Sequence, residues 1–182
     1  MQIIPTSFPE VLLLEPKVFG DERGYFYESF NARKFQEMTG LTPDFVQDNH
    51  SRSSQGVLRG LHYQIRHAQG KLVRASVGEV LDVVVDIRRS SPNFGKSASI
   101  RLSSANKRQL WVPPGFAHGF LVLSEFAEFQ YKTTDYWMPE HERCILWDDP
   151  AIGIDWELGT LVPNLSPKDR LGKPLAQAEV YE

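Results

Sequence analysis

Short strand-like segments separated by turn residues make up most of this chain. The segment 71–77 alternates in its side chains, and Gly78-Glu79 then turns the chain into 80–87. That second run is apolar at nearly every position, which predicts a strand covered on both faces. Further strands are predicted at 97–102, 109–112, 119–123 and 127–134. Strands at this spacing predict an all-β sandwich or jelly-roll barrel rather than βαβ units.

Helix is expected in only two places. The first is 31–39, where Asn31 can cap the start and Gly40 ends the helix. The second is a short turn at Ser166-Pro167-Lys168-Asp169, which has a capping serine, a proline at the first helical position and an acid after it. The helices are therefore short additions to a β fold.

Length and charge limit the classes of protein to consider. The 182 residues predict a single domain, 1–182, with a core that needs no disulfide. The net charge of −3 argues against nucleic-acid binding. The run 80–87 is interrupted by Asp82 and Asp86, and the N-terminus carries no signal-peptide pattern, so neither a membrane span nor secretion is expected. Cys144 is the only cysteine, which favours a reducing compartment, the cytoplasm.

Two glycine-rich segments each end in one histidine. His62 closes the segment 56–62 and His118 closes 111–118, and neither is followed by a second histidine two residues later. A three-histidine metal site therefore cannot be assembled from these segments. We expect no metal and no other cofactor, and an isolated histidine near Arg, Lys and Tyr favours acid/base catalysis. A metal-dependent barrel enzyme and a non-catalytic sugar-binding barrel remain alternatives.

Six motifs follow one another in an order that is more specific than any one of them. They are Arg23-Gly24-Tyr25-Phe26, Gln47-Asp48-Asn49-His50-Ser51, Gly56-Val57-Leu58-Arg59-Gly60-Leu61-His62, Gln69-Gly70-Lys71-Leu72-Val73-Arg74, Pro113-Pro114-Gly115-Phe116-Ala117-His118-Gly119-Phe120 and Tyr131-Lys132-Thr133-Thr134-Asp135-Tyr136. Over nearly the whole chain, from about residue 3 to about 175, the sequence resembles the dTDP-4-dehydrorhamnose 3,5-epimerase family.

The resemblance implies a cupin-type jelly roll, a homodimer and metal-free inversion of two carbons of a nucleotide-linked 4-keto sugar. The implied reaction converts dTDP-4-dehydro-6-deoxy-D-glucose into dTDP-4-dehydro-L-rhamnose, a precursor of cell-surface polysaccharide such as the O-antigen of lipopolysaccharide. A relative that inverts only carbon 3 or carbon 5, in a related deoxysugar pathway, is the nearest alternative. A related sugar ketoisomerase would be expected to lack this Tyr, Lys and His set.

Four residues match the catalytic positions of the family. His62 suits the base, because the ordinary pKa of histidine, about 6.5, lies near working pH. Asp169 would hold its other ring nitrogen, although local sequence alone favours a plain helix cap as the role of that aspartate. Lys71 would stabilise the enolate oxygen, and Tyr131 would be the acid on the opposite face of the sugar. A solvated lysine and a core tyrosine are the simpler alternatives for these two residues.

The resemblance also implies a set of substrate-binding residues. They are Arg23, Glu28, Gln47, Asp48, Asn49, Arg59, His118, Trp137, Glu142 and Lys168. The charged ones could instead be ordinary surface residues, and His118 could be structural. Arg23 and Glu28 would come from the partner subunit. Trp137 stands where the family usually has tyrosine; if the strand continues, it shares the parity of Tyr131 and can stack on thymine. His50, His67 and His141 are expected in polar loops, with only His50 a candidate for ligand contact.

Overall fold

Antiparallel strands are the main regular elements of the computed structural model, which describes residues 1–182. One sheet has six strands in the order β1-β2-β10-β7-β12-β5, and it faces a second sheet of five strands in the order β13-β6-β11-β8-β9. The first sheet contains β1 (Gln2–Ile4), β2 (Leu12–Glu15), β5 (Gln47–Ser54), β7 (Lys71–Val77), β10 (Gln109–Val112) and β12 (Phe126–Thr133). The second contains β6 (Leu58–Gln64), β8 (Glu79–Asp86), β9 (Ser97–Ser103), β11 (Phe116–Val122) and β13 (Glu142–Cys144). The predicted cupin-type jelly roll is confirmed.

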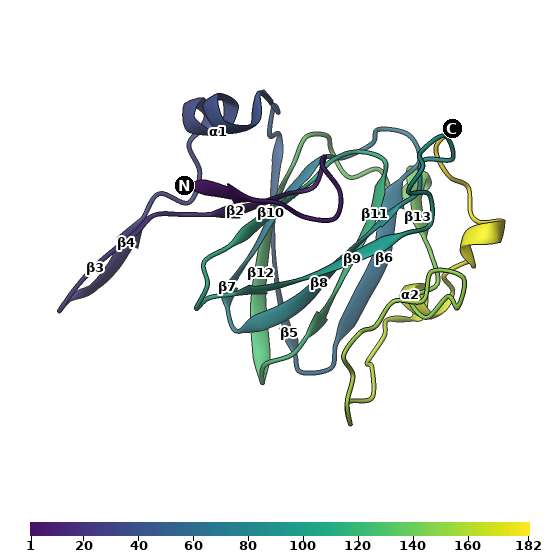
Figure 1. The fold of residues 1–182 in the computed structure, drawn as a ribbon. Helices are drawn as coiled ribbons and strands as arrows, with labels where there is room; N and C mark the ends of the chain where they lie inside the picture. Colours follow the sequence, from purple (N-terminus) through teal and green to yellow (C-terminus); the bar gives the residue numbers. More distant parts are fainter.

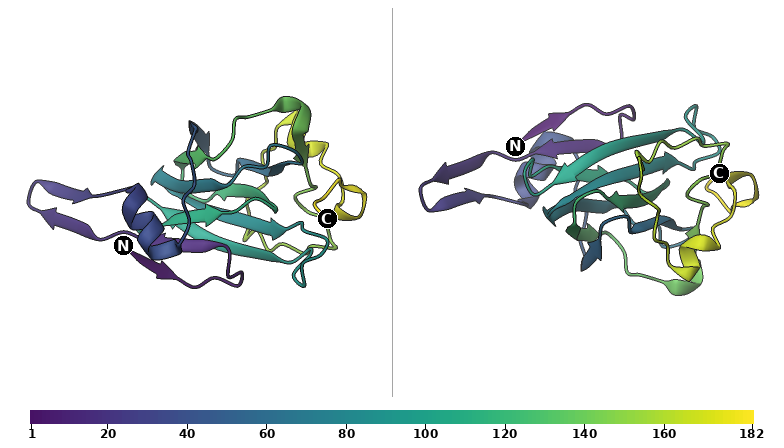
Figure 2. Two further views of the ribbon diagram at one scale, coloured as in Figure 1. Left: turned by 90° about the horizontal axis from the view of Figure 1, so that it is seen from above. Right: turned by 90° about the horizontal axis from the view of Figure 1, so that it is seen from below.

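A third sheet, of two strands, lies outside the barrel. Strands β3 (Val18–Asp21) and β4 (Gly24–Tyr27) form a hairpin that projects away from the two sheets (Figures 1 and 2). Its side chains are unusually apolar for a solvated arm, since Tyr25 is 61% exposed and Phe26 is 70% exposed. An exposed aromatic pair on a protruding arm is typical of a surface that contacts another molecule.

The helical segments are short, as predicted. Helix α1 (Ala32–Thr39) starts where the Asn31 side chain accepts a hydrogen bond from the Lys34 amide, and ends at Gly40 in the left-handed conformation. Helix α2 (Pro167–Arg170) is capped by Ser166. Two 3-10 turns, η1 (Pro139–His141) and η2 (Leu175–Gln177), complete the set. No helix is long and apolar enough to cross a bilayer.

The environment of strand β8 explains why the segment 80–87 is apolar at nearly every position. Val80 and Val84 belong to the cluster of buried residues between the two sheets. Their neighbours Leu81, Val83 and Val85 face the other way, where the C-terminal segment covers the five-stranded sheet with residues such as Trp156. The prediction of a strand covered on both faces is therefore confirmed, because neither face of β8 meets water.

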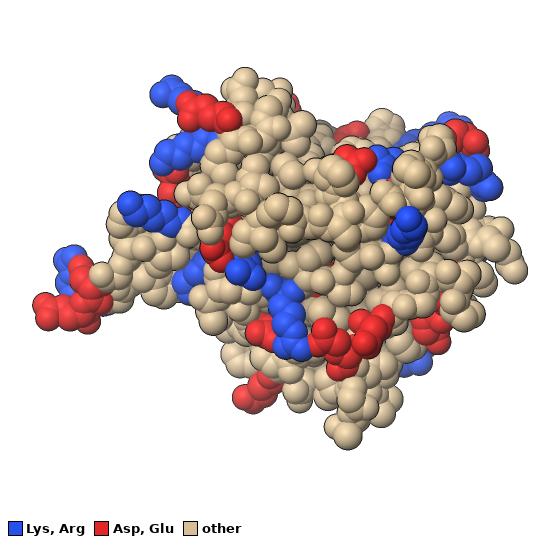
Figure 3. Space-filling model, in the orientation of Figure 1, with Lys and Arg blue, Asp and Glu red and all other residues tan.

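Most Lys, Arg, Asp and Glu side chains lie outside this core. Lys and Arg are interspersed with Asp and Glu over the face seen in Figure 3, and the end of the projecting arm carries both signs. The surface has no large single-sign area on this face, in keeping with the net charge of −3.

Candidate active site

Strand parity brings three of the predicted catalytic side chains into one pocket. Lys71 on β7 and Tyr131 on β12 come from the six-stranded sheet, and His62 on β6 comes from the five-stranded sheet. The pocket has a volume of about 240 Å³. Its lining residues are Gln47, Asn49, His62, Gln69, Lys71, Tyr131, Trp137 and Glu142. A base and an acid on facing sheets can reach opposite faces of a ligand held between them.

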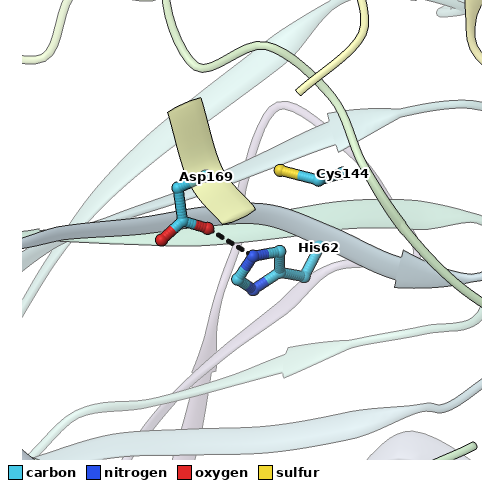
Figure 4. Close-up of side chains that lie close together, drawn as sticks. All are labelled: His62, Cys144 and Asp169. Atoms are coloured by element: carbon cyan, nitrogen blue, oxygen red, sulfur yellow. Dashed lines mark hydrogen bonds and ion pairs between the residues drawn. The ribbon is translucent and has the colours of Figure 1, made fainter. Parts of the chain in front are cut away.

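His62 is held from behind by Asp169. The His62 Nε2 atom lies 2.6 Å from Asp169 Oδ1, and the side chain of Asp169 is only 3% exposed (Figure 4). Burial alone would raise the pKa of Asp169, but hydrogen bonds from His62 and Ser166 outweigh it and hold this pKa at about 2. The carboxylate is thus charged at neutral pH and accepts the Nε2 proton, which leaves the Nδ1 lone pair free on the far side of the ring.

The two explanations offered for Asp169 prove compatible. Its backbone amide donates to the Ser166 hydroxyl, as a helix cap requires, and that hydroxyl donates to Asp169 Oδ2 at 2.7 Å. The amide of Gly60 donates to Oδ1 at 3.3 Å. The capped turn therefore fixes the carboxylate that in turn orients His62.

Glycines allow strands β6 and β11 to approach closely beside His62. A Cβ atom on Gly60 would lie 2.6 Å from the Gly119 Cα atom, and one on Gly119 would lie 2.6 Å from the Arg59 carbonyl oxygen. Gly60 also has a φ of +117°, which side chains disfavour. The register shifts between His118 and Phe120 at the same place. The glycines of the two histidine motifs thus serve this close approach.

Lys71 is poorly solvated in this pocket. Burial lowers its pKa to about 8, although the negative charges of Glu142 and Asp82 oppose that shift. An ammonium with little water around it interacts strongly with an oxyanion placed beside it. Lys71 is therefore not the freely solvated lysine of the simpler alternative.

Tyr131 keeps its proton at neutral pH. Burial raises the pKa of its phenol; the positive charge of Arg59 opposes this increase and the negative charge of Glu142 adds to it. A neutral phenol can donate a proton to a carbanion on its side of the pocket. Arg59 itself donates to the Ser53 hydroxyl and lies close enough to Tyr131 to influence its charge.

A second histidine–aspartate pair lies inside the barrel. His118 is opposite His62 in the β11–β6 register, and its Nε2 atom lies 2.9 Å and 3.0 Å from the two oxygens of Asp82. The His118 ring also stacks on Phe129. His118 does not belong to a group of side chains that could together bind a metal ion. The one such group consists of His62, Cys144 and Asp169. His118 thus faces Asp82 and the apolar core.

Trp137 reaches the pocket by a route that differs from the prediction. Strand β12 ends at Thr133, so the argument from continued strand parity is wrong, and Trp137 comes from the loop that follows. Its amide donates to Gln47 Oε1 and its indole Nε1 donates to Glu142 Oε2, both at 3.1 Å. Trp137 is 55% exposed and also lines the pocket, so its ring is accessible to a ligand.

Glu142 connects this ring to a charge network. Burial would raise the pKa of Glu142, but hydrogen bonds from Lys168 and Trp137 hold it below its usual value. Glu142 and Lys168 form an ion pair at the edge of the pocket. The arrangement keeps a carboxylate charged beside His62 and Lys71.

The remaining predicted binding residues lie outside the pocket of their own chain. Arg23 is 85% exposed near the tip of the arm and pairs with Asp21 at 2.6 Å. Glu28 pairs with Lys34 at 2.8 Å. Asp48 pairs with Lys132 at 2.8 Å on the opposite face of β5 from Gln47 and Asn49.

The other histidines also lie apart from the pocket. His50 was expected in a polar loop, but it lies within β5 and pairs with Glu128 at 3.1 Å. This expectation is wrong because the polar run 47–54 forms an edge strand with one solvated face. His67 and His141 stack on each other with ring centroids 5.5 Å apart.

Two residues of the site were not singled out from the sequence. Gln69 lines the pocket two residues before Lys71, inside one of the six motifs. Asp82 is fully buried. The sequence did contain a sign of its role, because Asp82 is a charged residue in a strand predicted to be covered on both faces. Such a residue requires a partner, and His118 supplies it.

Comparisons with known proteins agree with this geometry. The model of the dTDP-4-dehydrorhamnose 3,5-epimerase family matches residues 5–177. A dTDP-4-dehydrorhamnose 3,5-epimerase from Pseudomonas aeruginosa is 62% identical, over 100% of this chain and 99% of that protein.

Solved structures similar to this chain are also sugar-nucleotide epimerases. A dTDP-6-deoxy-D-glucose-3,5-epimerase from Legionella pneumophila in complex with dTDP-4-keto-L-rhamnose is 55% identical with a TM-score of 0.95, covering 98% of this chain and 94% of that chain. A 3'-monoepimerase from Streptomyces bikiniensis in complex with dTDP-quinovose is 31% identical with a TM-score of 0.91, covering 98% and 89%. This chain is therefore an isomerase and belongs to the dTDP-4-dehydrorhamnose 3,5-epimerase family.

Proposed function

We propose that this protein inverts carbons 3 and 5 of dTDP-4-dehydro-6-deoxy-D-glucose to give dTDP-4-dehydro-L-rhamnose. The observation that carries the proposal is the placement of His62, held by a charged Asp169, on the sheet facing that of Tyr131 and Lys71. Protons on carbons beside a ketone are weakly acidic, so inversion needs a base on one face and an acid on the other.

The reaction divides among these residues as follows. The Nδ1 lone pair of His62 takes the proton from the carbon beside the ketone, and Asp169 stabilises the imidazolium that forms. The Lys71 ammonium stabilises the negative charge that develops on the ketone oxygen. The Tyr131 phenol then gives its proton to the opposite face of the same carbon, which inverts it.

The nucleotide is bound around the rim of the pocket. Trp137 stacks on the thymine ring, and Gln47 and Asn49 offer hydrogen bonds from the same side. Arg59, whose guanidinium lies near Tyr131, meets the diphosphate. Glu142 and Lys168 close the edge nearest His62.

A second copy of the chain would complete the site. Arg23 and Glu28 do not line the pocket of their own chain, and the arm that carries Arg23 projects with its aromatic side chains exposed. In a two-fold dimer the partner subunit's Arg23 and the partner subunit's Glu28 would reach the nucleotide. The nucleotide-sugar substrate and the single free thiol of Cys144 favour work in the cytoplasm.

The test is to incubate the protein with this sugar nucleotide in deuterium oxide, without added metal. We expect two deuterons, at carbons 3 and 5, by mass spectrometry and proton NMR, with the L-sugar trapped by a reductase. One deuteron would instead favour single-carbon inversion, an alternative supported by the likeness to the 3'-monoepimerase structure. No deuteron would refute the proposal and favour a sugar-binding role, and activity that requires a metal would favour a metal-dependent barrel.

A further inference from the structure

Cys144 lies directly beside the base of the proposed reaction. It is opposite His62 in the β13–β6 register. The ring nitrogen of His62, the sulfur of Cys144 and a carboxylate oxygen of Asp169 all lie within 4.8 Å of one another (Figure 4). Imidazole, thiolate and carboxylate are the three ligand types that proteins use for Zn²⁺. The reaction proposed above has no use for the sulfur.

The spacing of these donors is close to that of a tetrahedral zinc site. Bond lengths of about 2.0 to 2.3 Å place neighbouring donor atoms roughly 3.3 to 3.7 Å apart. The His62 Nε2 to Asp169 Oδ1 distance of 2.6 Å would have to open by about 1 Å. The sulfur lies within 4.8 Å of the other two donors, so it would have to approach by about 1 Å at most. Side-chain rotation is sufficient for movements of this size.

One of the three donors, Cys144, also lines a second pocket of about 520 Å³ between β13 and the C-terminal segment. An ion that meets the sulfur from this pocket has the donor atoms of His62 and Asp169 within 4.8 Å of that sulfur. Lys168 also lines that pocket, and its positive charge would oppose a cation. Arg143 and Lys173 line the pocket as well. The charge of Lys168 is paired with Glu142, and that of Arg143 with Glu179. Burial and the negative charge of Asp169 raise the pKa of Cys144 to about 12, so the ion has to displace the thiol proton.

We propose that His62, Cys144 and Asp169 form an inhibitory site for a thiophilic divalent cation such as Zn²⁺. The ion takes the Nε2 lone pair of His62, the proton formerly on Nε2 moves to Nδ1, and the thiol of Cys144 releases its proton to solvent. A neutral imidazole, a thiolate and a carboxylate around a doubly charged ion sum to no net charge. Protonated Nδ1 has no lone pair, so His62 cannot take the proton from the sugar.

The inhibition rests on the proposed function, whereas the metal site does not. The metal site is tested with Co²⁺ alone, because the chain has one cysteine and any thiolate-to-cobalt charge-transfer band must come from Cys144. We expect such a band in the near-ultraviolet for the full-length protein and none for Cys144→Ser. Absence of the band in the unmodified protein would overturn the proposal.

The effect on catalysis is measured with Zn²⁺. We expect micromolar Zn²⁺ to lower kcat with little change in KM, and a chelator to restore it. Cys144→Ser should keep the metal-free turnover but need at least about tenfold more Zn²⁺ for half-inhibition, since even loss of an outer-shell partner weakens metal sites by about 10- to 100-fold. Equal sensitivity of the two proteins would overturn the proposal.

A matched control comes from a second pair of histidines near the surface. His67 and His141 stack beside Asp135 and offer an alternative place for a cation. His141→Ala should leave both the cobalt band and the zinc inhibition unchanged; loss of either would overturn the assignment. A protein that shows the band but never exchanges sugar protons would refute the proposed reaction and leave the metal site standing.

Discussion

Replacing Asp169 with asparagine isolates the contribution of the carboxylate to the base. The pKa of Asp169 lies at about 2, against 3.8 for an ordinary aspartate. At about 1.36 kcal/mol per pKa unit, the partners of the carboxylate favour its charged form by about 2.5 kcal/mol. The hydrogen bond from His62 is the largest cause that lowers this pKa, so much of that energy is available to stabilise the imidazolium.

The expected loss of rate follows from that energy. A loss of about 2.5 kcal/mol corresponds to a fall in kcat of roughly 60-fold. Asparagine can also hold the wrong imidazole tautomer, and in serine-protease triads the same substitution lowers kcat by about 10⁴. We therefore expect kcat to fall between about 60-fold and 10⁴-fold with KM nearly unchanged, measured by coupled reduction of the product.

Stability supplies an independent readout of the same substitution. Because the pKa of Asp169 is lowered on folding, its contribution is present above the unfolded value of 3.8 and is lost as pH falls toward about 2. Asp169→Asn should unfold in less urea than the unmodified protein at pH 7, with the difference narrowing between about pH 4 and pH 2.

A hydroxyl deletion provides the matched control. Ser166→Ala removes the cap and one hydrogen bond to the carboxylate but keeps the His62 contact, so it should lose about 1 kcal/mol of stability and little rate. A kcat for Asp169→Asn within threefold of the original would refute the reasoning.

The remaining predictions concern the oxyanion, the nucleotide and the dimer. Activity should fall as pH rises through about 8, where the lowered pKa of Lys71 removes the ammonium; a rate that stays flat to pH 10 would contradict this. Lys71→Met should lose about 10² to 10³ in kcat yet be as stable at pH 7 or more so, by up to about 3 kcal/mol in urea unfolding, because no charge is then buried. Trp137→Ala should raise KM by roughly 5- to 150-fold if stacking contributes about 1 to 3 kcal/mol, and an unchanged KM would remove the ring from the site. Mixing inactive Arg23→Ala and His62→Asn chains should restore about a quarter of full activity, since half of random dimers are mixed and each has one intact site; no restoration would reject the shared site.

Alternating patterns predicted the barrel well because burial decides which side of a strand is apolar. The segment 80–87 was correctly read as covered on both faces, since a strand between two apolar layers leaves a continuous apolar run. The polar run 47–54 was not recognised as a strand, because an edge strand with one solvated face and a site on the other carries few apolar residues.

The site was only partly predictable for a different reason. Parity correctly placed Tyr131 inside the barrel, because parity is a local property of one strand. It failed for Trp137, because nothing in the local pattern shows that β12 ends at Thr133. The closeness of Cys144 to His62 depends on a strand pairing between residues 82 positions apart in the chain, which no local pattern contains.

The central claim is that His62 and Tyr131 act on opposite faces of the sugar. The most direct test follows deuterium uptake by the 4-keto sugar with Tyr131→Phe and His62→Asn in deuterium oxide. The account predicts that Tyr131→Phe still exchanges the sugar proton through His62 but does not invert the carbon, while His62→Asn neither exchanges nor inverts. Normal inversion by Tyr131→Phe, or continued exchange by His62→Asn, would contradict it.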